Sequence, residues 1–199
     1  MSKTPHDLCQ SVQGTILSTT SLDLRWLTLA DAPALQAICE SKQVAAMSGS
    51  IAHPYPEGKA EAFIREYAPK IEQGDAYVWG IFERSSGALI GDTMLGINKR
   101  FIAGEFGYII AEEHWGKGYA TETLAAVLGF GFDTIGLRRI SGICSVDNEA
   151  SARVMEKNGL AREAHFRDSY LKWGVWEDEY VYAITRPVYE QRKQEQSNR

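Results

Sequence analysis

The sequence predicts a mixed α/β domain built in layers around one central sheet. Segments with the alternating or continuous apolar residues of strands are interspersed with segments whose apolar residues recur at helical spacing. The 199 residues suffice for one domain with a substantial core, and 44% of them are hydrophobic. No apolar run approaches the roughly 20 residues that a membrane-spanning helix needs, so we expect no membrane association.

The N-terminal part of the chain is expected to contribute one strand and two helices. In the helix at 29–47, Asp31 is a candidate N-cap and Pro33 is tolerated in the first turn. In the helix at 59–74, Pro69 is expected to bend or divide the helix. The predicted elements are a polar arm at 1–20, a strand at 22–28, a helix at 29–47, a loop rich in Pro, Gly and Ser at 48–58 and a helix at 59–74.

The C-terminal part of the chain alternates strands with helices. Lys157 in a last turn and Gly159 just past it form a stop signal, which ends a helix at 148–159. Residues that favour β-structure dominate the short strand at 104–110. The predicted elements are strands at 76–84, 88–97 and 104–110, a long helix after Gly118, a strand at 138–146, a helix at 148–159, two strands at 160–168 and 177–185 around a loop, and a polar tail at 188–199. We therefore expect one domain at 21–187.

Charge and cysteine content narrow the classes of function. A net charge of -5 and a pI near 5.4 argue against a nucleic-acid binder, which normally presents a basic face, and are compatible with a cationic substrate such as an amine. Cys9, Cys39 and Cys144 lie far apart without a CxxC pair, which argues against a disulfide framework and against a zinc site. The N-terminus lacks the apolar core of a signal peptide. We expect a cytoplasmic protein that binds no metal.

The stretch EEHWGKGYATET at 112–123 follows a predicted strand and opens a predicted helix. Gly116 and Gly118 remove side chains from a turn that exposes backbone N–H groups at the positive end of a helix dipole, where anions bind. A P-loop is excluded because Lys117 is followed by glycine instead of Ser or Thr. The dinucleotide fingerprint fails because Thr121 stands where its third glycine belongs. Taken alone, the motif is equally consistent with a plain turn between strand and helix.

A second motif begins 30 residues after Gly118. Asn148 and Ser151 open a short helix, which Gly159 and Leu160 close. Together with WGKGYA, this pattern resembles the GNAT superfamily of acyl-CoA-dependent N-acetyltransferases, and in particular its Rim-type branch of ribosomal-protein N-terminal acetyltransferases. The resemblance covers most of the predicted domain. It implies a mostly antiparallel sheet with helices on both faces, a coenzyme A site, and direct transfer of an acetyl group from acetyl-CoA to a primary amine in a ternary complex.

The resemblance assigns cofactor binding to the glycine turn and to the ends of neighbouring elements. Trp115 replaces the Gln or Arg that is usual in the family, which matters little because the motif acts through backbone N–H groups. Asn148 corresponds to an asparagine that hydrogen-bonds the pantetheine amide, and its alternative role is a simple helix N-cap. The implied cofactor-binding residues are Ile109, Ile110, Trp115, Gly116, Lys117, Gly118, Tyr119, Ala120, Thr121, Asn148 and Ser151.

Two residues are candidates for catalytic proton transfer. Glu105 stands where the family often carries a glutamate that deprotonates the amine through water, and the alternative is a solvated glutamate at a strand edge. Ser151 could reach the thioester sulfur and help the thiolate leave. Met155 occupies a position where many members carry a tyrosine that protonates the thiolate, and methionine has no proton to donate. Cys144 is expected to be a buried small hydrophobic residue.

By analogy, the acceptor amine binds between the loop at 48–58 and the segment RDSYLKWGVWED near the C-terminus. It belongs to a protein N-terminus or to a small molecule. Met155 keeps a second hypothesis open, in which the chain is a catalytically weak acyl-CoA-binding or regulatory module. The sequence leaves both a monomer and a homodimer open. The residues that could line the acceptor site are His53, Tyr55, Tyr170, Trp173 and Trp176.

Overall fold

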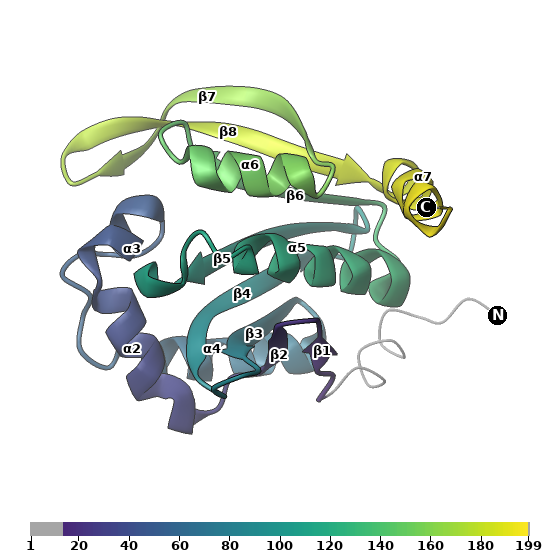
Figure 1. Ribbon diagram of the computed structural model, residues 1–199. Helices are drawn as coiled ribbons and strands as arrows, with labels where there is room; N and C mark the ends of the chain where they lie inside the picture. Colours follow the sequence, from purple (N-terminus) through teal and green to yellow (C-terminus); the bar gives the residue numbers. More distant parts are fainter. Residues whose placement is uncertain (1–13, 199) are drawn as a thin grey trace.

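An eight-stranded sheet runs through the molecule, with the strand order β1-β2-β3-β4-β5-β6-β8-β7 and helices on both faces (Figure 1). The computed structural model describes residues 14–198. The strands are β1 (Leu17–Ser18), β2 (Leu22–Trp26), β3 (Ala76–Glu83), β4 (Leu89–Asn98), β5 (Ala103–Ile110), β6 (Arg139–Ser145), β7 (Ala161–Lys172) and β8 (Val175–Thr185). The helices are α2 (Ala32–Glu40), α3 (Lys42–Met47), α4 (Lys59–Gln73), α5 (Tyr119–Gly129), α6 (Glu149–Lys157) and α7 (Arg186–Ser197). The predicted layered α/β fold with one mostly antiparallel sheet is confirmed.

The sheet divides into two parts that diverge at its centre. All neighbouring strands are antiparallel except β5 and β6, which are parallel and pair only where Ala103–Glu105 faces Arg139–Ser141. Beyond Glu105, β5 continues to pair with β4 as far as Ile110, and β6 continues to pair with β8 as far as Ser145. An opening therefore lies between β5 and β6 beyond Glu105 and Ser141.

Two hydrophobic cores lie on the two faces of the sheet. On one face α5 and α6 pack beside each other (Figure 1), over a core that includes Trp79, Leu124 and Phe132. On the other face α2 packs against α4, over a smaller core around Leu35 and Cys39. Burial of these apolar side chains is the main force that holds both helix layers on the sheet.

The helix predicted at 29–47 is divided. Ser41 has extended backbone angles, φ -61° and ψ 122°, and separates α2 from α3. Its hydroxyl accepts a hydrogen bond from the amide of Val44 at 3.4 Å, so this serine is the N-cap of α3. The break turns α3 toward the end of the β7–β8 hairpin. By contrast, α4 continues through Pro69.

The loop predicted between the last two strands is replaced by a tight hairpin. β7 and β8 pair as far as Lys172 and Val175, which leaves Trp173 and Gly174 as a two-residue turn. Both turn residues have positive φ, 48° and 86°, as the turns that suit the twist of hairpins require. Strand pairing therefore extends over most of the predicted loop and carries Trp173 to the tip of the hairpin.

Both ends of the predicted domain have structure beyond it. The polar tail predicted at 188–199 largely belongs to α7, which is anchored where Tyr189 stacks on Phe132 with ring centroids 4.6 Å apart. Within the predicted polar arm, Leu17–Ser18 pairs with β2, and residues 1–13 lie outside the described part of the chain. Among residues 14–198, no helix is long and apolar enough to cross a membrane.

Candidate active site

The turn between β5 and α5 leaves a helix N-terminus open. Gly118 is the N-cap of α5 with φ 86°, and Gly116 has φ 74°, so both adopt the left-handed conformation that favours glycine. A Cβ atom added at either position would meet no atom within 4 Å. No side chain among residues 14–198 caps α5 at this end, and the first N–H groups of a helix have no partner within the helix. The turn therefore has the space and the donors to hold a phosphate-bearing group.

Side chains on both sides of the glycines fix this turn to the sheet. Trp115 Nε1 donates a hydrogen bond to the carbonyl oxygen of Ile110 at 2.6 Å. Tyr119 donates its hydroxyl to a carboxylate oxygen of Glu83 at 2.7 Å, which holds the first residue of α5 against the end of β3. Lys117 is exposed. The residues predicted from Trp115 to Thr121 thus form the anchored turn and the first turn of α5.

The backbone of β5 presents alternate residues to the opening. The amide nitrogen of Ala111 donates a hydrogen bond to the carbonyl oxygen of Ile90 at 2.8 Å. Because hydrogen-bonded and non-hydrogen-bonded pairs alternate along an antiparallel ladder, this bond shows which residues of β5 are bonded to β4. By this alternation the backbone groups of Ile109 face β4, whereas those of Tyr108 and Ile110 face the opening. Of the two strand residues predicted to bind the cofactor, Ile110 therefore has backbone groups that face the opening, and Ile109 does not.

A tyrosine that the sequence did not indicate joins the predicted residues on α6. Tyr108 Oη lies 3.0 Å from Ser151 Oγ in a shared hydrogen bond. Burial raises the pKa of Tyr108 to about 12, so its phenol holds a proton at neutral pH. The only sequence signal was a tyrosine in the strand GYII, and nothing in the sequence places it beside a helix 43 residues away.

Asn148 is the side-chain cap of α6 and also contacts α3. Its Oδ1 accepts from the amide of Ser151 at 3.0 Å, and its Nδ2 donates to the carbonyl of Met47 at 3.1 Å. The amide nitrogen carries a second hydrogen that can serve a ligand. Asn148 is therefore an N-cap, and its geometry also permits the predicted contact with a pantetheine amide.

Two residues near this site point into the core. Met155 is fully buried on the inner face of α6. Cys144 is buried as predicted, and burial raises the pKa of its thiol to about 11, which keeps it protonated and weakly nucleophilic. The side chain at the position of the family's usual tyrosine is thus a core residue, and the hydroxyl groups available here are those of Tyr108 and Ser151.

Glu105 is the last residue of β5 that pairs with β6, and it stands where the two strands separate. Its side chain is exposed. Three positions separate Glu105 from Tyr108, and successive side chains of a strand alternate between faces, so these two side chains lie on opposite faces of β5. One face therefore carries a carboxylate and the other a pair of hydroxyl groups.

The β7–β8 hairpin closes against the loop at 48–58. Lys172 Nζ donates to the carbonyl oxygens of Ala46 at 2.5 Å and of Ser48 at 3.0 Å, and burial lowers the pKa of this lysine. The ring centroids of His53 and Trp173 lie 6.1 Å apart. In the described part of the chain, the buried Nδ1 of His53 has no hydrogen-bond partner.

The other predicted acceptor residues lie at different depths. Tyr170 donates its hydroxyl to Glu177 at 2.6 Å, and its ring is the nearest group to a Cβ added at Gly49, at 3.5 Å. Tyr55 packs against the smaller core and hydrogen-bonds Cys39. The hairpin and the loop are thus brought together, and Tyr55 of this loop packs against the smaller core. Trp176 is exposed beyond the turn.

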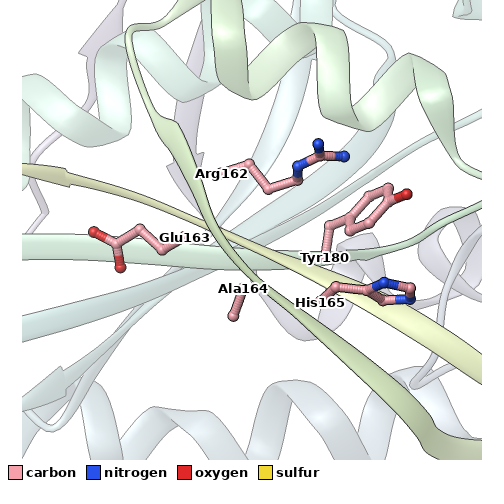
Figure 2. A pocket seen from close by; sticks show the side chains of 5 residues that line it. All are labelled: Arg162, Glu163, Ala164, His165 and Tyr180. Atoms are coloured by element: carbon pink, nitrogen blue, oxygen red, sulfur yellow. The ribbon is translucent and has the colours of Figure 1, made fainter.

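A shallow pocket of about 300 Å³ lies elsewhere, on the β7–β8 edge, and contains none of the predicted residues. In Figure 2, Arg162, His165 and Tyr180 gather on one side of β7, and Glu163 points away from them. These groups are already paired, because Arg162 stacks over Tyr180 at 4.5 Å, His165 contacts Asp178 at 2.6 Å and Glu163 pairs with Arg139. The pocket is not a candidate for the active site.

Comparison with known proteins places this geometry in a family. Residues 21–161 match the family model of an acetyltransferase (GNAT) domain. A Bacillus subtilis protein described as the uncharacterized N-acetyltransferase YoaA is 32% identical over 173 residues, which cover 86% of this chain and 97% of that protein. The ribosomal protein uS5-alanine N-acetyltransferase of Escherichia coli is 28% identical over 139 residues, which cover 68% of this chain and 70% of that protein.

The solved structure of RimL, a ribosomal L7/L12 N-acetyltransferase in complex with coenzyme A, has the same fold. Its TM-score is 0.79 at 21% identity, over 86% of this chain and 98% of that chain. The Rim-type resemblance expected from the paired motifs is therefore matched in sequence and in fold. The chain belongs to the GNAT family of acetyltransferases.

Proposed function

We propose that the protein transfers the acetyl group of acetyl-CoA directly to a primary amine within a ternary complex. The observation that carries this proposal is the opening between β5 and β6, which adjoins the open N-terminus of α5. Such a site can hold an anionic group on the glycine turn and an extended polar arm along the free edge of β5. Coenzyme A has both parts, a pyrophosphate and an amide-bearing arm, and acetyl-CoA supplies an acyl group activated as a thioester.

The residues that would hold the cofactor form a continuous path. Backbone N–H groups from Gly116 to Thr121 would bind the pyrophosphate. The backbone edge at Tyr108 and Ile110 would pair with the pantetheine arm, and Asn148 Nδ2 would serve one of its amides. Lys117 is an exposed supporting charge at most, since the glycine turn already offers its own donors.

Proton transfer would use both faces of β5. On one face Glu105 removes a proton from the attacking amine, through water. On the other face the hydroxyls of Tyr108 and Ser151 supply a proton to the departing sulfur. The alternative hypothesis of a catalytically weak module was based on Met155. The Tyr108–Ser151 pair supports the catalytic proposal, because it offers hydroxyl protons that a methionine lacks.

The acceptor is a primary amine of a protein N-terminus or of a small molecule. The net charge of -5 is compatible with a cationic acceptor, and the uS5-alanine N-acetyltransferase is a relative whose acceptor is protein-bound. The proposal places the reaction in the cytoplasm, as the sparse cysteines of the sequence predict.

Steady-state kinetics and intact-mass spectrometry test the direct transfer. We expect double-reciprocal plots at several amine concentrations to intersect, and the mass of the protein to stay unchanged after incubation with acetyl-CoA alone. Parallel lines together with an added acetyl group on the chain would replace direct transfer with a covalent intermediate.

A further inference from the structure

An aspartate lies in the middle of the sheet, one strand away from the opening. Asp92 is on β4 and pairs with Gly80 of β3 on one side and with Ile109 of β5 on the other. Its surroundings on this face are apolar, since a Cβ added at Gly80 would lie 2.7 Å from Leu27 and 2.8 Å from Leu89. An ionisable carboxylate is therefore held among apolar side chains.

The Asp92 carboxyl group has no counter-charge in the described part of the chain. Among residues 14–198, no group donates a hydrogen bond to it and no cation forms an ion pair with it. Burial alone raises its pKa to about 7. The residue as a whole is half-buried, and its carboxyl group lies on the face of the sheet near Cys39 and Tyr55.

The ionisable neighbours of Asp92 come from α2 and from the loop at 48–58. Its negative charge is one of the influences that raise the pKa of Cys39, to about 12, and the pKa of Tyr55, after burial as the largest cause. Both neighbours are thus neutral at physiological pH and cannot compensate a carboxylate. Tyr55 connects Asp92 to the predicted acceptor region.

A buried carboxyl group without a partner destabilises the folded state, and a bound cation would offset that cost. A metal is a poor match, because a lone carboxylate beside a protonated thiol and a phenol offers too few ligands. The matching chemistry is a single cationic nitrogen, whose approach would favour the ionised carboxylate.

We propose that Asp92 is the carboxylate that binds the ammonium group of the acceptor amine and thereby selects cationic acceptors. This inference rests on the proposed function for the identity of the ligand. Asp92 is a specificity-determining residue here, and proton removal stays with Glu105. The apolar side chains of Leu89 and Ile109 on the same face suit an aliphatic carbon next to the nitrogen.

Equilibrium binding tests the inference without requiring turnover. Protein loaded with coenzyme A is titrated with n-butylamine and with the neutral n-pentanol, and the backbone amide signals of Tyr55 and Ile109 are followed by NMR. We expect Asp92→Asn to weaken n-butylamine binding by roughly 30-fold or more and to leave n-pentanol binding unchanged. The matched control is Asp75→Asn, which removes a surface carboxylate that pairs with Lys99 at 2.7 Å.

Kinetics provide the second measurement. We expect Asp92→Asn to raise KM for amines by a similar factor while kcat changes by less than about 3-fold. Unchanged amine affinity in Asp92→Asn, or no amine binding by the unmodified protein, would overturn the inference. A protein that binds n-butylamine through Asp92 and acetylates no amine would contradict the proposed function and leave the amine site standing.

Discussion

Tyr108 Oη and Ser151 Oγ lie 3.0 Å apart, although they belong to β5 and α6 and are 43 positions apart in the sequence. The contact joins the strand that borders the opening to the helix that begins at Asn148. Two hydroxyl groups joined by a hydrogen bond can relay a proton. The pair can therefore donate a proton to a departing thiolate, which the buried Met155 cannot do.

The first prediction concerns this hydroxyl pair. We expect Tyr108→Phe and Ser151→Ala each to lower kcat by roughly 10-fold or more, because each removes one member of the proton path. The double variant should lose less than the product of the single losses, since both act through one contact. Tyr182→Phe is the matched control, because Tyr182 also donates from a strand to α6, to Glu156 at 3.1 Å. Full activity in both single variants would leave the acid unassigned.

The second prediction concerns the glycine turn. Gly118→Glu places a side chain and a negative charge where a phosphate would bind, so we expect coenzyme A affinity to fall by roughly 100-fold or more in calorimetric titration. Gly136→Glu is the control, because Gly136 is also left-handed at φ 85° with open space around it. Equal affinity in the two variants would remove the turn from the cofactor site.

The third prediction concerns the base. Glu105→Gln should lower kcat by roughly 100-fold, because the carboxylate that accepts the proton is lost, while coenzyme A affinity stays within error. The exposed Glu149→Gln, which loses only an ion pair with Arg153, should be fully active. A fully active Glu105→Gln would show that Glu105 is a solvated residue at the strand edge.

The fourth prediction concerns stability and pH. The ordinary pKa of an aspartate is 3.8 and that of folded Asp92 is about 7, so the folded state resists ionisation. Its stabilising contribution is complete below pH 3.8 and is lost as the pH rises to about 7. Asparagine does not titrate. We therefore expect the free energy of unfolding of Asp92→Asn to exceed that of the unmodified protein, and the excess to grow by about 2–3 kcal/mol between pH 5 and pH 8.

Urea denaturation at the two pH values measures this difference. A constant difference between the two proteins, or a less stable Asp92→Asn at pH 8, would mean that Asp92 is ionised and stabilised in the folded state. That result would also weaken the argument that the fold leaves this carboxyl group free for a ligand.

The order of elements was predictable because it depends on local patterns. The strands from 22 to 110 follow apolar alternation, and Gly118 and Gly159 mark the start of α5 and the end of α6. Features that depend on tertiary pairing were not predictable. Ser41 divides a helix because its hydroxyl caps α3, and Trp173 becomes a turn residue because β7 and β8 pair almost to their ends.

The two proposed site residues that sequence reasoning missed have the same explanation. The role proposed for Tyr108 depends on its contact with Ser151. The role proposed for Asp92 depends on its burial among apolar side chains. Both features arise only in the folded structure. The lone aspartate within the strand LIGDTMLGI was a usable signal of a candidate site, because an aspartate is rarely buried in the centre of a sheet without a partner. The glycine turn was easier to find, because its function resides in the backbone and glycine spacing is visible in sequence.

The central claim is that this chain moves an acetyl group from acetyl-CoA to an amine. The most direct measurement follows release of free coenzyme A thiol at saturating acetyl-CoA, with and without a panel of primary amines that includes short peptides with free N-termini. We predict thiol release that depends on an amine and is matched one for one by N-acetylated product in mass spectrometry. Tight binding of acetyl-CoA without amine-dependent thiol release, for every acceptor in the panel, would contradict the claim and favour an acyl-CoA-binding module.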